Sequence, residues 1–137
     1  MSKSAIYTVN TSPSSLVIST TSPFATIPLG STIRRFGCNL QQVGNGIAAQ
    51  GTGYYKINAS VTITPTAAGN VTVVAFKDGV SIHGATATGS VTTVGNTVSV
   101  PITAIIRNTC CDSSTLTFAL TTASATINNI AVTVEKL

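Results

Sequence analysis

The sequence predicts an all-β domain, an antiparallel β-sandwich or jelly roll of eight to ten short strands. Residues 53–65 alternate apolar and polar side chains almost without error, which is the period of a strand with one face in a core. Turn residues recur between similar short runs from residue 31 to the end. No segment keeps helical spacing over three turns. Together these observations favour one domain built of strands.

Residues 1–31 are expected to form an extended arm outside this domain. Residues 6–9 are compatible with a short strand, but three prolines surround the apolar residues Leu16, Val17 and Ile18. Proline removes a ladder donor, so such a segment is at most an edge strand. Leaving three branched apolar side chains in water is costly. We therefore expect them to dock on another protein, such as a neighbouring chain, while residues 32–137 fold alone as a head domain.

Strand and turn signals alternate through the predicted head. Residues 54–65 are expected to pair with residues 71–77 through the turn at 66–70, and Asp78-Gly79 and Gly95-Asn96 are expected to be tight hairpin turns. In the last strand the alternation changes parity at Asn128-Asn129, which requires a bulge or a turn. The remaining predicted strands lie at residues 31–40, 43–51, 80–94, 97–107, 114–121 and 125–137.

The composition favours a chain that assembles. Charged residues make up 7% of the sequence, against about 25% in ordinary soluble domains, while Ser and Thr number 39 and mean hydropathy is +0.42. A membrane helix is disfavoured because the uncharged stretch 79–106 is broken by Gly, His, Ser, Thr, Asn and Pro and has no apolar run of 18 residues. Disorder is disfavoured because apolar residues recur at strand spacing. Assembly into a larger structure remains.

The net charge of +4 and pI of 9.3 raise the question of nucleic-acid binding. However, the basic residues are scattered along the sequence and do not alternate with aromatic residues, so no nucleic-acid partner is expected. The N-terminal residues MSKSAIYTVN lack the apolar core of a signal peptide. We therefore expect synthesis in a cytoplasm and, if the protein is exported, a route other than a signal peptide, such as release by lysis.

Few residues are suited to catalysis, so no enzymatic activity, cofactor or metal is expected. The carboxylates are Asp78, Asp112 and Glu135, none near another in sequence, and His83 is the single histidine.

The three cysteines are Cys38, Cys110 and Cys111. Adjacent cysteines in a strand point to opposite faces, so Cys110 and Cys111 do not readily chelate one tetrahedral metal. Three alternatives stay open: one buried cysteine with the other as a loop thiol near Asp112, a disulfide to Cys38, and a metal site, with the first preferred.

The segments GTGYYKINASVTITP, GNVTVVAFKDG and INNIAVTVEKL resemble the TNF-like jelly-roll heads of trimeric proteins. These include complement-type heads, the tips of bacterial collagen-like exosporium glycoproteins and small phage or prophage virion proteins. The resemblance covers about residues 32–137 and implies a homotrimer with the central and final strands near the threefold axis. The trimer-interface residues that it implies are Tyr54, Lys56, Asn58, Thr133 and Glu135.

The function expected from these features is that of a non-enzymatic phage virion protein, a trimeric decoration or head-fibre protein attached to the major capsid protein at the virion surface. In this expectation the arm residues Leu16, Val17 and Ile18 dock on the capsid. The alternative is a receptor- or glycan-binding fibre tip, with its site in the loops at 77–84 and 108–114 and a host-surface glycan as partner. Neither hypothesis involves nucleic acid or a membrane.

Overall fold

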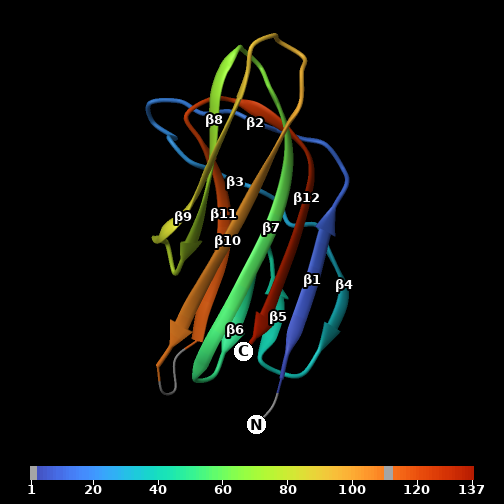
Figure 1. The fold of residues 1–137 in the computed structure, drawn as a ribbon, viewed down its shortest axis with the longest axis vertical. Helices are drawn as coiled ribbons and strands as arrows, with labels where there is room; N and C mark the ends of the chain where they lie inside the picture. The colour runs from blue at the N-terminus through green and yellow to red at the C-terminus, as the bar shows by residue number, and fades with distance from the viewer. Residues whose placement is uncertain (1–2, 110–112) are drawn as a thin grey trace.

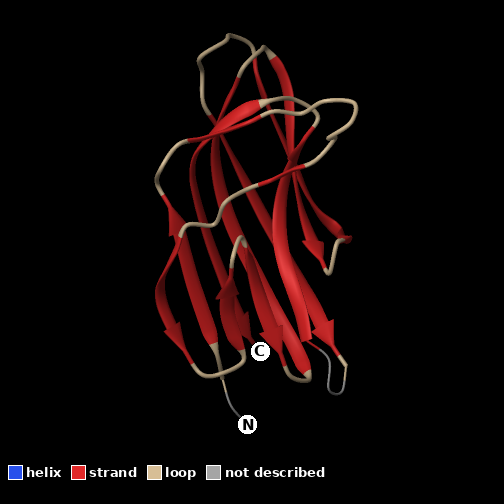
Figure 2. Ribbon diagram, turned by 180° about the vertical axis from the view of Figure 1, so that it is seen from behind, coloured by secondary structure: helices blue, strands red, loops and turns tan. Residues whose placement is uncertain are grey.

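The computed structural model describes residues 3–109 and 113–137, and these residues form two facing antiparallel sheets without a helix (Figures 1 and 2). We call them the β7 sheet, in the order β10-β7-β12-β1-β4 with β2 beside β12, and the β8 sheet, in the order β5-β6-β11-β8-β9 with β3 beside β11. The strands are β1 (Ala5–Asn10), β2 (Ser14–Leu16), β3 (Ala25–Thr26), β4 (Ser31–Phe36), β5 (Leu40–Val43), β6 (Gly46–Gln50), β7 (Gly53–Pro65), β8 (Gly69–Lys77), β9 (Val80–Val91), β10 (Val98–Asn108), β11 (Ser113–Thr121) and β12 (Ala125–Lys136). The predicted all-β sandwich is confirmed.

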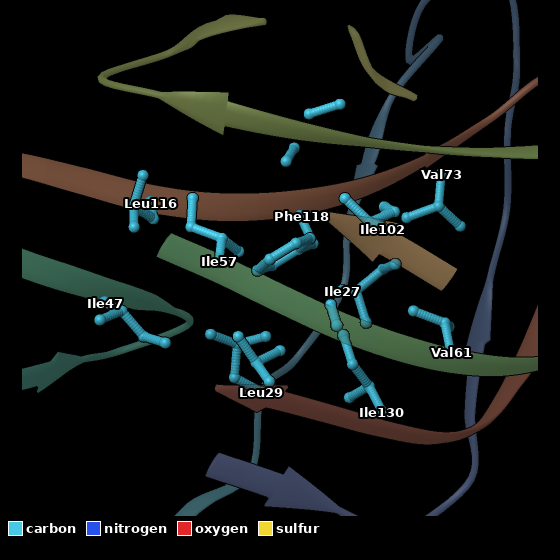
Figure 3. Close-up of a cluster of buried hydrophobic side chains, with 14 of the residues drawn as sticks. Ile27, Leu29, Ile47, Ile57, Val61, Val73, Ile102, Leu116, Phe118 and Ile130 are labelled. Carbon is cyan, nitrogen blue, oxygen red and sulfur yellow. The ribbon is translucent and has the colours of Figure 1, made fainter. Parts of the chain in front are cut away.

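The long alternating segment is β7, which lies inside its sheet and pairs with β10 on one side and β12 on the other. Its inward residues Tyr55, Ile57, Val61 and Ile63 are completely buried, as the alternation predicts. They pack against side chains of the β8 sheet, among them Phe118 (Figure 3). Burying each such side chain contributes roughly 1.5–3 kcal/mol to folding. The outward side chains of β7 are thereby held in fixed positions on a rigid face.

Two of the predicted irregularities are present. Asp78 and Gly79 have φ values of 53° and 81° and connect β8 to β9 as a tight hairpin. The register between β12 and β7 shifts between Ile127 and Asn129, which is the predicted bulge. There Asn128 Nδ2 donates a hydrogen bond to Thr64 Oγ1 at 2.7 Å.

Two other predicted hairpins are wrong. β7 and β8 do not pair, because the turn after Pro65 carries the chain from one sheet to the other. The turn at Gly95-Asn96 likewise leads from β9 in the β8 sheet to β10 in the β7 sheet. An alternating pattern identifies a strand and its buried face but does not identify its partner, since either sheet satisfies that pattern.

The structure also differs from the expected N-terminal arm, because the described part of residues 1–31 is integrated in the sandwich. β1 pairs with β12 over six residues and with β4 on its other side. Ile6 is buried, and Ile27 and Leu29 are completely enclosed in the core, where Figure 3 shows them between the sheets. The expected boundary between residues 31 and 32 therefore does not separate an arm from a head.

The residues expected to dock on a capsid are partly covered by the chain itself. Leu16 lies in β2 opposite Ala125, and Leu16 and Ile18 both pack against the core cluster. The Ile18 N–H donates to Ser124 Oγ at 2.9 Å. Only Val17, which is 73% exposed, points into solvent. Two of these three side chains are thus used within the sandwich.

Candidate self-association surface

The five residues expected at a trimer interface lie together on the outer face of the β7 sheet. The register places Asn58 of β7 opposite Thr133 of β12, and Lys56 opposite Glu135. Directly opposed side chains in an antiparallel pair are about 5 Å apart at Cβ, so these pairs are in contact range. Tyr54 follows on the same face, at the end of β7, and is 52% exposed. The structure therefore brings the predicted residues into one row of neighbours.

The same face is hollowed at its centre by a shallow depression, which we call the sheet-face concavity. Its volume is about 370 Å³, and its lining contains no charged side chain. The small pair Ser60 and Ala131 lies directly opposite across β7 and β12, which leaves room for a side chain from outside. The lining residues are Asn58, Ala59, Ser60, Pro101, Ile102, Thr103, Ala131 and Thr133.

Most of these lining residues were missed by the sequence reasoning. Asn58 and Thr133 were predicted, whereas Ala131 and the lining residues of β10 were not. The pairing of a serine with an alanine identifies Ala131, but this pairing is known only from the strand register. The predicted interface residues Tyr54, Lys56 and Glu135 lie toward one end of the same face, beside the concavity.

Exposed apolar and aromatic side chains flank the concavity. On the β10 side, Ile105 is 58% exposed and the Arg107 guanidinium carbon lies 5.8 Å from the centre of the Tyr54 ring. On the β4 side, Tyr7 and Phe36 are exposed and border a small apolar hollow. Large apolar side chains next to an uncharged surface are typical of the anchors of protein–protein interfaces.

Outside this face, the titratable side chains of Asp78 and Tyr55 form hydrogen bonds with backbone groups of the sandwich. The Thr115 N–H donates to the Asp78 carboxylate at 2.9 Å, which ties the β8–β9 turn to β11. The Tyr55 hydroxyl donates to the Gln50 carbonyl at 2.8 Å, and burial raises the pKa of Tyr55 above its ordinary value. His83 is exposed on β9.

Among residues 3–109 and 113–137 no cluster of three or more His, Cys, Asp or Glu side chains has metal-site geometry. Cys38 is a free, exposed thiol. Cys110, Cys111 and Asp112, the middle residues of the loop at 108–114, lie outside the described residues. In the part of the chain that the structure describes, no helix has the length and apolar character needed to cross a membrane.

No protein-family model and no curated protein sequence matches the chain. Solved structures do match over nearly its whole length. Murine APRIL at pH 8.0 superimposes with a TM-score of 0.76 at 14% identity, covering 99% of this chain and 100% of the other. The chain has the TNF-like jelly-roll fold. The expected fold is thus confirmed, and it includes the N-terminal residues that were expected to lie outside it.

Two further solved structures with the TNF-like jelly-roll fold also match, and they belong to proteins of different kinds. The PRD1 vertex protein P5 matches with a TM-score of 0.68 at 17% identity, covering 98% of this chain and 96% of that one. The globular domain of zebrafish complement 1qA matches with a TM-score of 0.68 at 9% identity, covering 97% and 95%. At such identities the likeness concerns the fold.

Proposed function

We propose that the chain is a non-enzymatic structural head that assembles as a homotrimer and decorates the capsid surface of a virion. In this proposal its partners are two further copies of itself and the major capsid protein. The observation that carries it is the sheet-face concavity with its flanking aromatic residues. Such a face is built for contact with protein rather than for chemistry.

Self-association is supported by the low free energy that is needed to remove water from this face. Desolvating hydroxyls and small apolar groups costs much less than desolvating charges, and the concavity has no charge to desolvate. Tyr54, Ile105 and Phe36 supply exposed apolar area beside it. The resemblance to TNF-like heads, in which the corresponding central and final strands lie near a threefold axis, favours a trimer over other assemblies.

A virion role is supported by the likeness in fold to the PRD1 vertex protein P5 and by the composition. A surface rich in hydroxyls and poor in charge suits a protein whose copies are crowded on a particle, because it carries little mutual repulsion.

The oligomeric state tests the first part of this proposal. Ala131→Arg places a long charged side chain in the concavity, so we expect light scattering to give a mass below that of the wild type, which should be three times 13.9 kDa. Thr86→Arg adds the same charge to an exposed position on β9 of the other sheet and should leave the trimer intact. A wild-type mass of one chain would contradict the proposal.

Attachment tests the second part. Wild-type protein added to particles lacking it should restore the decoration, seen as added density on the capsid surface in electron micrographs. Density at the tail, or none on the capsid, would reject the decoration role.

A glycan-binding tip is the second candidate, and one observation favours it. Phe24 and Phe76 meet edge to face with ring centres 5.4 Å apart, on the outer side of the β8 sheet. With Thr26, Gly79 and Thr117 they line a hollow of about 220 Å³ that offers an aromatic ring and hydroxyls to a sugar. Binding to a neutral glycan array that Phe24→Ala abolishes would favour this role.

A further inference from the structure

The charged residues, which are scattered in the sequence, gather at one end of the folded molecule. Five long segments, 4–33, 36–55, 57–76, 79–106 and 113–134, contain no Asp, Glu, Lys or Arg. Most of the described charged residues lie between these segments near strand ends that meet at one end of the sandwich, where β1 begins and β12 ends in Figure 1. We call this end the basic pole and the opposite end the neutral pole.

The strand registers establish this gathering. Arg107 of β10 is opposite Tyr54, and Lys136 of β12 is opposite Tyr55, so both cations lie in the last rows of the β7 sheet. Lys56 is two residues further along, opposite Glu135.

The remaining cations join the same end from other strands. On β4, Arg34 and Arg35 are opposite Tyr7 and Ile6, close to the start of β1. The Lys77 ammonium donates to the Arg107 carbonyl at 2.9 Å, which brings this cation beside Arg107, although β8 itself ends partway up the molecule in Figure 1. The seven basic residues are Lys3, Arg34, Arg35, Lys56, Lys77, Arg107 and Lys136.

The neutral pole contrasts with this arrangement. It carries the loops that connect β2 to β3, β7 to β8, β9 to β10 and β11 to β12, which cross the top of the molecule in Figure 1. These loops consist largely of Ser, Thr, Ala, Gly and Pro. The seven cations and two carboxylates of the described residues are thus offset toward one pole, and a trimer with parallel chains would combine three such poles.

From this segregation we infer that the basic pole is the docking face of the molecule and that its partner is an acidic protein surface. Under the proposed function, on which the identity of the partner rests, that surface belongs to the capsid and the neutral pole faces outward. The cations steer the approach and fix its orientation, because a field concentrated at one end favours one end-on encounter.

An acidic protein fits this pole better than a nucleic acid does. Glu135 and Asp78 lie among the cations, and a mainly acidic protein surface can place a cation of its own opposite each of these carboxylates, whereas a phosphate backbone carries no cation. Arg34 and Arg35 are both exposed at this pole, and Arg is enriched in the centres of protein–protein interfaces.

The test compares two full-length variants that have equal net charge but carry the change of charge at opposite poles. Lys3→Gln, Arg34→Gln and Lys136→Gln together remove three cations from the basic pole. The matched control, Thr20→Asp, Ala67→Asp and Thr93→Asp, adds three carboxylates at exposed positions of the neutral pole. Light scattering and thermal melts verify that both variants keep the wild-type assembly.

The probe is fluorescently labelled poly-L-glutamate, with duplex DNA of similar length in parallel. We expect the basic-pole variant to bind polyglutamate about tenfold more weakly than the wild type at 50 mM salt, and the control to stay within about twofold. Wild-type binding should also weaken when salt is raised to 200 mM.

Equal weakening in both variants would overturn the inference, because it would show a response to net charge alone. Wild-type binding to DNA that is tighter than binding to polyglutamate would overturn the assignment to an acidic protein. A failure of the proposed function appears differently: the wild type would not decorate capsids although its polyglutamate binding depends on the basic pole.

Discussion

Thr8 is completely buried in β1, and its hydroxyl has no hydrogen-bond partner among the residues that the structure describes. An unpaired buried hydroxyl costs about 1–3 kcal/mol. Thr8→Val removes that hydroxyl and keeps a branched side chain of similar size. We therefore expect the free energy of unfolding, measured by urea denaturation, to rise by about 1 kcal/mol.

Thr8→Ala is the control, because it removes the hydroxyl and also a methyl group, which leaves a cavity. It should be less stable than Thr8→Val. A Thr8→Val protein less stable than the wild type would mean that the hydroxyl forms a bond that stabilises the fold.

Other buried polar residues are satisfied, and the comparison shows what the sequence can predict at this scale. Ser114 Oγ donates to Asn108 Oδ1 at 2.5 Å, and Asn108 Nδ2 donates to the Ala49 carbonyl at 3.0 Å. The alternation of β7 correctly predicts its buried side chains. It does not predict this network, because Asn108 and Ala49 are 59 residues apart and meet only through the pairing of distant strands.

At the scale of elements, the segment around β1 was the hardest to predict, and its prolines are the reason. A proline cannot donate to a ladder, so the short runs around them do not read as strands. In the fold, the Pro28 carbonyl accepts a hydrogen bond from Asn10 Nδ2 at 3.1 Å, so the missing N–H of this proline is not required. The neighbouring Ile27 N–H donates to the Phe118 backbone carbonyl at 2.8 Å. Side-chain burial at alternate positions therefore continues where the ladder does not.

This arrangement predicts that β1 is essential for folding. Removing residues 1–30 deletes an internal strand and the buried side chains of Ile6, Ile27 and Leu29, each contributing roughly 1.5–3 kcal/mol. Since small domains have only 5–15 kcal/mol of stability, we expect the shortened chain to show no cooperative thermal transition by circular dichroism. Val17→Ser, at an exposed position of the same segment, should melt like the wild type. A shortened chain that melts cooperatively would restore the two-part organisation.

At the scale of the whole molecule, the two faces discussed above adjoin, and Tyr54, Lys56 and Arg107 lie on the border between them. The lining of the sheet-face concavity is uncharged and lies on the side of the sandwich, whereas Arg34, Arg35 and Lys136 lie toward its end. Copies that associate through the concavity can therefore keep their basic poles parallel. Sequence composition predicted an assembling chain, but the segregation of charge requires the strand registers.

Folding and assembly should then be linked, and thermal stability should depend on protein concentration. If folded chains associate through the concavity and unfolded chains do not, mass action stabilises the folded state as protein concentration rises. For a chain of 137 residues we expect Tm to increase by about 3 °C for each tenfold rise in concentration. Ala131→Arg should melt at a lower temperature that does not change with concentration, because it removes the association and leaves the sandwich core intact. A wild-type Tm that stays constant over a hundredfold range, measured by scanning calorimetry, would mean that the sandwich folds as an independent monomer and that its uncharged face has another partner.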